Sequence, residues 1–156
     1  MLLLRSIFFT FLLPGSVTVL IPYLIFRANT DTRNFGPFQY LGLPLIAMGG
    51  FGLLWCIWQF FAEGRGTLAP VDPPKELVVR GLYRFVRNPM YVSVMSILLG
   101  ETIFFASIGI LIEAVIFFLA THLFIVFYEE PHLKRQFGST YEQYLRSVRR
   151  WVPRLR

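Results

Sequence analysis

The sequence predicts an all-helical integral membrane protein with about four transmembrane helices, of which the last two form a helical hairpin, followed by short amphipathic C-terminal helices. Hydrophobic residues make up 55% of the 156 residues and charged residues only 15%. The mean hydropathy is +0.57. The apolar residues fall in runs too long and too numerous for the core of a soluble protein of this size. The length favours a single domain.

Residues 1–61 are expected to hold the first two transmembrane helices. The first apolar run covers about residues 6–26 and contains Pro14 and Pro22, which predict a kink. It is not interpreted as a signal peptide, because no cleavage pattern of small residues follows it. The second run covers about residues 38–61 and is rich in glycines, which let helices approach closely. These glycines are Gly42, Gly49, Gly50 and Gly52.

Residues 62–88 form the long polar connection and are expected to be a cytoplasmic loop. Three prolines in its first part, Pro70, Pro73 and Pro74, argue against a helix there. From Leu77 onward apolar and basic residues alternate, a pattern typical of a segment that lies on a membrane surface. A connection of this length with its own pattern is more often functional than passive.

The stretch from residue 92 to 128 is apolar except for three ionisable residues, Glu101, Glu113 and His122. As one helix it would rise about 1.5 Å per residue and far exceed a hydrocarbon core of about 30 Å. The sequence therefore predicts a hairpin of two helices, over about residues 89–105 and 109–128, with a turn at residues 106–109.

The tail after residue 128 is charged, with apolar residues on one helical face. Spacings of three and four residues place them there, and Gly138 is expected to break the tail into two short helices. The apolar residues are Leu133, Phe137, Tyr141, Tyr144 and Val148. The predicted hairpin and the tail together cover residues 89–156.

The distribution of basic residues predicts the orientation in the membrane. The loop at residues 62–88 and the tail hold twelve of the fifteen Lys and Arg residues. The positive-inside rule places that side, and both termini, in the cytoplasm. The net charge of +6 then indicates contact with membrane lipids, and we do not expect nucleic acid as a partner.

Cysteine and histidine are scarce. Cys56 is the single cysteine, so no intramolecular disulfide can form. No group of histidines and carboxylates has metal-site spacing, and we expect no metal site.

The predicted hairpin brings residues 83–91 close to Glu129 and Glu130. Two adjacent carboxylates at a membrane boundary repel each other and require a cationic partner. Either these residues form a polar pocket for a charged soluble cofactor, or Arg87 forms an ion pair that joins the ends of the hairpin. The sequence leaves both interpretations open.

Three motifs resemble one family. Residues 81–91, with the sequence GLYRFVRNPMY, resemble the G-x-Y-x-x-x-R-[HN]-P-x-Y segment of the isoprenylcysteine carboxyl methyltransferase and phospholipid methyltransferase group. The EEPHL and FGSTYEQY segments of the tail, and Arg150-Trp151-x-Pro153, resemble the tail of that group. The resemblance covers residues 68–153, whereas residues 1–67 match only as generic membrane helices.

The resemblance implies that S-adenosyl-L-methionine binds at the cytoplasmic end of the last two helices, under the tail, and that a lipophilic or prenylated acceptor enters from the bilayer. Arg87 and Glu130 become the candidate catalytic residues. The residues that carry over to the cofactor site are Tyr83, Arg87, Asn88, Pro89, Tyr91, Glu129, Glu130 and Leu133. Many members have histidine in place of Asn88, so a hydrogen bond remains available there but proton transfer does not.

Five further residues are candidates for contact with the acceptor: Glu101, His122, Tyr141, Tyr144 and Arg150. An ionisable residue inside a membrane helix is a functional candidate by default, which favours Glu101. It also lies close enough to the predicted turn to reach the far membrane surface. His122 either faces the pocket or packs against a neighbouring helix.

The resemblance predicts a methyltransferase acting on a membrane-associated lipid or a prenylated small molecule. One alternative is a membrane reductase of the sterol reductase type, which uses a nicotinamide cofactor and has similar R-x-P-x-Y and Tyr-x-x-Tyr features. Another is a non-catalytic membrane protein. Cofactor binding distinguishes the three interpretations: the methyltransferase binds S-adenosylmethionine, the reductase binds NADPH, and binding of neither favours the non-catalytic protein.

Overall fold

The computed structural model describes residues 14–28, 36–63 and 79–153, and for residues 60–63 the backbone alone. Every named element in these ranges is a helix, and the strand-like pairing among the described residues is one isolated bridge between Val86 and Arg149. The predicted all-helical class is confirmed for this part of the chain. Most of the predicted loop at residues 62–88, the start of the first apolar run, and Arg154 and Arg156 lie outside the described residues.

The first apolar run is helical where it is described. A π-helical turn, η1 (Ser16–Leu20), leads into α2 (Ile21–Ala28). The hydroxyl of Thr18 donates a hydrogen bond of 2.7 Å to the carbonyl of Pro14, four residues earlier. This wide turn lies directly before Pro22, where the sequence predicts a kink.

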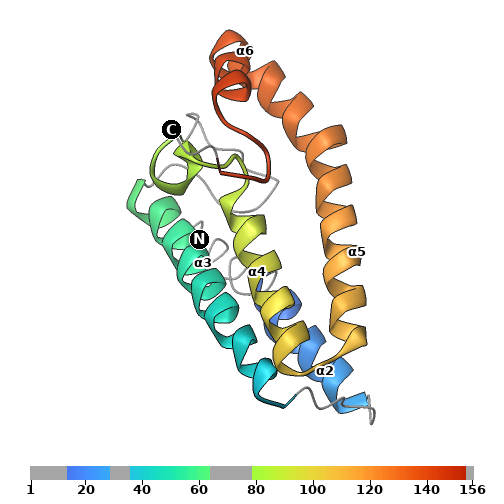
Figure 1. Ribbon diagram of the computed structural model, residues 1–156. Coiled ribbons are helices and arrows are strands. Elements are labelled where there is room, and N and C mark those ends of the chain that lie inside the picture. The colour runs from blue at the N-terminus through green and yellow to red at the C-terminus, as the bar shows by residue number, and fades with distance from the viewer. Residues whose placement is uncertain (1–13, 29–35, 64–78, 154–156) are drawn as a thin grey trace.

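The second run forms the short 3₁₀ helix η2 (Gly36–Leu41) and the long helix α3 (Gly42–Glu63). Helix α3 packs along α4 (Pro89–Phe104), as Figure 1 shows. The two backbones approach so closely that a Cβ atom at Gly49 would lie 2.5 Å from the carbonyl oxygen of Ser93, and one at Gly100 would lie 2.7 Å from that of Gly42. The predicted role of glycine in close helix packing is confirmed for Gly49 and Gly42, but at Gly50 a Cβ atom would meet nothing within 4 Å.

The predicted hairpin is present. Helix α4 begins at Pro89, where a residue without an amide hydrogen is tolerated because the first amides of a helix have no internal partner. The chain turns at Ala106, whose φ is 49°, and the Ser107 hydroxyl accepts a hydrogen bond from the amide of Ile110 at the start of α5 (Ile108–Phe124). Near this turn, Leu98, Ile110 and Ala114 are almost completely buried.

Helix α5 continues without a break into the tail, which the sequence did not predict. A π-helical turn, η4 (Ile125–Glu129), links it to α6 (Glu130–Ser147), and Figure 1 shows the continuous rod bending over one end of the bundle. Within α6, Gly138 has a φ of 53° and a ψ of −127°, so the predicted break at this glycine is confirmed.

Two helical segments are long and apolar enough to cross a membrane, Gly36–Gln59 and Ile108–Ser147. The apolar part of the second ends at Tyr128, beyond which the helix is charged. The other apolar helices, Ser16–Ala28 and Pro89–Phe104, are shorter than a full span. The described chain is therefore an all-helical protein with two candidate membrane spans, and the number four stays a prediction.

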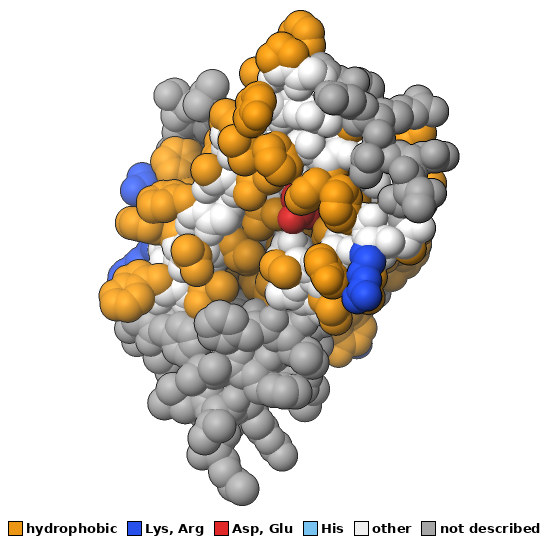
Figure 2. Space-filling view, turned by 90° about the horizontal axis from the view of Figure 1, so that it is seen from below, with side chains coloured by type: hydrophobic (Ala, Val, Ile, Leu, Met, Phe, Trp, Pro, Cys, Tyr) orange, Lys and Arg blue, Asp and Glu red, His pale blue; other side chains and the backbone are white. Residues whose placement is uncertain are grey.

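Figure 2 shows the end of the molecule at which α4 turns into α5. Hydrophobic side chains cover most of the described surface, and an acidic side chain is visible in a hollow near its centre. The acidic residues of the helices that meet here are Glu101 and Glu113. This apolar end lies opposite the end that carries α6 and the polar network described next.

Candidate functional site

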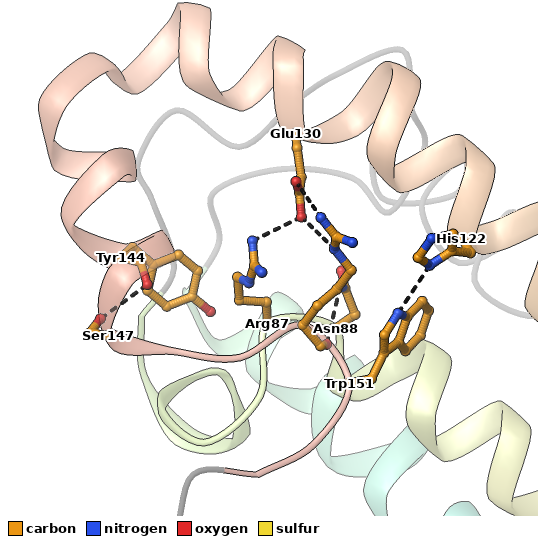
Figure 3. A network of polar contacts seen from close by, with 8 residues as sticks. Arg87, Asn88, His122, Glu130, Tyr144, Ser147 and Trp151 are labelled. Atoms are coloured by element: carbon orange, nitrogen blue, oxygen red, sulfur yellow. Dashed lines mark hydrogen bonds and ion pairs between the residues drawn. The ribbon is translucent and has the colours of Figure 1, made fainter.

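The candidate site lies where the start of α4, the junction of α5 and α6, and the last described residues come together (Figure 3). Residues 148–153, here called the C-terminal strap, run back from α6 to the start of α4. The amide of Arg87 donates a hydrogen bond of 2.9 Å to the carbonyl of Arg149, and the side-chain amide of Asn88 donates one of 3.4 Å to the carbonyl of Arg150. The strap is thus attached to the residues that precede α4.

Glu130 is the centre of the polar network. Its Oε1 accepts hydrogen bonds of 2.8 Å from Nη1 of Arg87 and from Nε of Arg150, and its Oε2 accepts one of 2.9 Å from Nη2 of Arg150. The pair with Arg150 is bidentate, which fixes the geometry of both side chains. The side chain of Arg87 is 14% exposed, that of Glu130 is 18% exposed and that of Arg150 is 27% exposed. One carboxylate therefore joins three segments that are distant in the sequence.

Glu129 differs from its neighbour because its buried Oε2 has no hydrogen-bond partner in the described part of the chain. Burial, and then repulsion by the Glu130 carboxylate, raise the pKa of Glu129 to about 7. The buried Nε of Arg87 also has no acceptor among the described residues. The site therefore contains an unpartnered acceptor and an unpartnered donor.

The wide turn η4 leads directly to the two glutamates. The amide of Glu130 donates to the carbonyl of Ile125, five residues earlier, and Pro131 has no amide hydrogen to donate. A π-helical turn adds a residue to the helical register and is frequent at functional sites. The turn η4 ends at Glu129 and Glu130, of which Glu130 is paired with two arginines and Glu129 is not.

The tyrosines of α6 hold the second part of the tail against the start of the site. The hydroxyl of Tyr144 donates a hydrogen bond of 2.8 Å to the carbonyl of Tyr83. Tyr141, Tyr144 and Val148 form a buried cluster, against which Leu133 packs. Burial and the nearby Glu130 raise the pKa of Tyr141 to about 12, so its hydroxyl stays protonated at neutral pH.

Trp151 of the strap contacts α5. Its indole Nε1 donates a hydrogen bond of 3.2 Å to Nδ1 of His122, and its ring lies 5.1 Å from that of Phe118, measured between centroids. His122 therefore contacts the strap, which is neither of the two alternatives that the sequence left open, the pocket and a neighbouring helix. Trp151 was not among the candidate site residues, although it belongs to the Arg150-Trp151-x-Pro153 motif, which was the available signal.

The remaining candidates divide between the two ends of α4. Asn88 and Pro89 are buried at its start, and the ring of Tyr91 lies 6.4 Å from that of Phe117 on α5. Glu101 belongs to the last turn of the same helix, about 18 Å further along at 1.5 Å per residue. The structure thus brings together all the candidates except Glu101.

Known proteins are similar to parts of this chain. A phosphatidylethanolamine N-methyltransferase of Aspergillus niger is 28% identical over 110 residues, covering 69% of this chain but 9% of that protein. An uncharacterised protein of Haemophilus influenzae is 35% identical over 63 residues, covering 40% of this chain and the whole of that protein.

The chain thus spans less than a tenth of the Aspergillus protein. The phospholipid methyltransferase family profile matches residues 38–140, which is more than half of the chain. The match includes α3, the α4–α5 hairpin, both glutamates and the first half of α6, and it ends before the strap. This chain belongs to the phospholipid methyltransferase family.

Proposed function

We propose that this protein transfers a methyl group from S-adenosyl-L-methionine to a lipophilic acceptor in the membrane, and that the site described above binds the donor. The observation that carries the proposal is the pair of glutamates at the junction of α5 and α6. Glu130 accepts hydrogen bonds from two arginines, whereas the neighbouring Glu129 has a buried carboxylate oxygen without a partner among the described residues.

The donor has the charges that the unpartnered atoms require. It carries a sulfonium and an ammonium group, both cationic, and a carboxylate. A buried carboxylate is stabilised by a nearby cation, so the Glu129 carboxylate would attract the cationic groups of the donor. The Nε of Arg87 would donate to a carboxylate or hydroxyl oxygen of the same molecule. The residues present therefore fit this cofactor.

Glu130 is proposed as a positioning residue rather than a catalytic one. Both of its oxygens accept hydrogen bonds from guanidinium groups of the protein itself, so its carboxylate is already occupied within the described part of the chain. It would hold Arg87 in the orientation that presents Nε to the cofactor. Through Arg150 it would also keep the strap over the site, where the strap excludes water.

Methyl transfer requires few further functions of the protein, because the donor is already reactive. When bound, the donor would supply an activated methyl group, which would pass to a nucleophilic atom of the acceptor as the bond to sulfur breaks and S-adenosylhomocysteine leaves. The residues around it would bind, align and exclude water. Tyr91 and Phe117, whose rings face each other between α4 and α5, would guide the acceptor toward the donor. His122, Tyr141 and Tyr144 would shape the site through their contacts with the strap and Tyr83.

The acceptor is proposed to be a membrane lipid, because the family and the Aspergillus relative are both named for phospholipid methylation. A prenylated carboxylate remains the second acceptor class, since the motifs resemble those of isoprenylcysteine carboxyl methyltransferases as well. The proposal places residues 62–88 and the tail on the cytoplasmic side, with four spans and residues 89–156 as the cofactor-binding half.

The direct test is methyl transfer from radiolabelled S-adenosylmethionine into a membrane lipid extract by the purified protein in lipid nanodiscs. We expect label in a lipid species, and less of it with Glu129→Gln. Glu113→Gln is the matched control, because Glu113 lies near the opposite end of the α4–α5 hairpin. Oxidation of NADPH without label would support the reductase alternative, and absence of both activities the non-catalytic one. Either outcome contradicts the proposal.

A further inference from the structure

Three aromatic side chains form a stack on the outer side of the helix that continues from α5 into α6. The rings of Phe124 and Tyr128 lie 5.1 Å apart at an interplanar angle of 28°, and those of Tyr128 and His132 lie 6.1 Å apart at 5°. Tyr128 is 51% exposed, Phe124 is 38% exposed, and His132 is exposed. We call these three residues the aromatic ladder.

Arg135 continues the ladder toward the charged part of α6. The four positions follow one another at spacings of four, four and three residues, which places them on one helical face. Nε of Arg135 donates to the carbonyl of Pro131 at 3.3 Å, and this exposed bond leaves the two terminal nitrogens of the guanidinium without a partner among the described residues. The adjacent Lys134 is different, because its Nζ forms an ion pair of 2.9 Å with Glu142.

The ladder faces away from the proposed cofactor site. Glu130, which points into that site, is two residues from both Tyr128 and His132, a rotation of about 200° around a helix. The ladder and the proposed cofactor site therefore lie on opposite sides of this helix.

The ladder also has a defined depth. The apolar part of its helix ends at Tyr128, so Phe124 and Tyr128 lie at the boundary of the hydrocarbon layer. At about 1.5 Å per residue His132 and Arg135 lie about 6 and 10 Å further along. The headgroup layer is about 5 to 8 Å thick on each side of the bilayer. The bend of α6 over the bundle, visible in Figure 1, keeps these residues close to that layer.

We infer that the aromatic ladder and Arg135 form a binding site for the headgroup of an anionic phospholipid that is not the methyl acceptor. The phosphate would accept hydrogen bonds from Arg135 and His132, and the acyl chains would lie against Phe124 and the apolar face of α5. A planar guanidinium suits phosphate geometry, and a cation near an anionic membrane surface contributes about 1 kcal/mol. The occupant is a lipid of the surrounding bilayer, because the aromatic half of the site lies at hydrocarbon depth.

The test is native mass spectrometry of the whole protein released from mixed micelles that contain phosphatidylglycerol and phosphatidylcholine. We expect the protein to retain phosphatidylglycerol preferentially, and Arg135→Ala to lower that retention about fivefold. Arg135→Lys, which keeps the charge but loses the planar fork, should give an intermediate value. Lys134→Ala is the matched control: it removes the same charge one residue away and should retain the lipid as the wild type does.

Three outcomes would overturn the inference. The first is equal retention of the two lipids by the wild type. The second is equal loss in the Arg135 and Lys134 variants, which would indicate diffuse charge attraction without a built site. Competition by free glycerol phosphate at the concentration of the lipid would also contradict it, because the aromatic half would then contribute nothing. The affinity for S-adenosylmethionine should be unchanged in all these variants, which separates this test from that of the proposed function.

Discussion

Helix α4 packs against α3 on one side and against α5 on the other, and the two contacts differ in kind. On the α3 side the backbones meet along the length of the helix, with no room for a Cβ atom at Gly49 or Gly100. On the α5 side the buried contacts gather near the turn, at Leu98, Ile110 and Ala114. At the other end, α4 and α5 are connected through the polar network and the strap.

The α3–α4 contact serves as the rigid scaffold, whereas the polar end of the α4–α5 pair contains the candidate site. Close packing of glycines uses van der Waals contact along two whole helices, so it fixes α3 and α4 relative to each other. The α4–α5 pair has no such seam beside the glutamates, and one carboxylate with two arginines holds it there. A site that must admit a cofactor and a lipid needs the second kind of connection, because ion pairs around a polar ligand can rearrange where packed glycines cannot.

The largest effect on stability is expected from removing the ion pairs of Glu130. Glu130→Ala would leave Arg87 and Arg150 without their shared partner, and breaking a buried ion pair costs several kcal/mol. Because these side chains are partly exposed, with 14% to 27% of their area accessible, we expect about 2 kcal/mol. Amide hydrogen exchange in the strap should accelerate by more than about tenfold, and the affinity for S-adenosylmethionine should fall.

Glu142→Ala is the control for this substitution. Its ion pair with Lys134 is exposed, and pairs of that kind contribute little. Equal protection of the strap in both variants would show that Glu130 does not hold it.

The glycine seam is tested by two adjacent substitutions on α3. Gly49→Ala places a Cβ atom 2.5 Å from the Ser93 carbonyl, whereas Gly50→Ala places one where no atom lies within 4 Å. Forcing atoms into packed contacts costs about 1 to 3 kcal/mol. We expect a lower midpoint of thermal unfolding in detergent for the first variant and an unchanged or slightly higher midpoint for the second, because alanine favours helix. Identical midpoints would contradict the seam.

The third prediction concerns the pH dependence of cofactor affinity. The pKa of Glu129 is raised from its ordinary value to about 7, so the ionised fraction of this carboxyl falls as the pH falls through that value. Only the ionised form attracts a cation. Between about pH 8 and pH 6 the affinity for S-adenosylmethionine should therefore fall about tenfold.

S-adenosylhomocysteine lacks the sulfonium charge, so its affinity should depend less on pH over this range. With Glu129→Gln both pH profiles should become flat. A steep profile that survives this substitution would assign the dependence to another group.

The smallest effect is expected at the contact between the strap and α5. Trp151→Phe keeps the aromatic packing on Phe118 but removes the hydrogen bond to His122. A bond of this kind contributes about 1 kcal/mol, so exchange of the strap amides should increase about fivefold. Trp58→Phe on the exposed face of α3, where Trp58 is 69% exposed, should leave that exchange unchanged.

Local features of the fold were predictable wherever one residue decides them. Pro89 begins α4, the turn follows at Ala106, and Gly138 breaks α6 with its positive φ. Periodicity could not show that α5 continues into α6, because Pro131 was interpreted as part of a separate tail, although proline is tolerated in the first turn of a helix.

The candidate site was predictable in its membership but not in its connections. The motifs identified both glutamates and Arg87. They did not reveal that Arg150 pairs with Glu130, since 20 residues separate the two and the pairing depends on how the strap folds back. Nor did they reveal that Oε2 of Glu129 has no partner among the described residues. The same holds for Gly49 and Gly50: composition identifies two glycines, and only the helix packing shows which one contacts α4.

The measurement that tests the central claim most directly is isothermal titration of the protein in nanodiscs with S-adenosylmethionine and, separately, with NADPH. The wild type should bind S-adenosylmethionine and should not bind NADPH. Glu129→Gln should weaken that binding about tenfold or more, and Glu113→Gln, at the apolar end of the hairpin, should leave it unchanged. Binding of NADPH in place of S-adenosylmethionine, or equal affinities in the wild type and the Glu129 variant, would contradict the account.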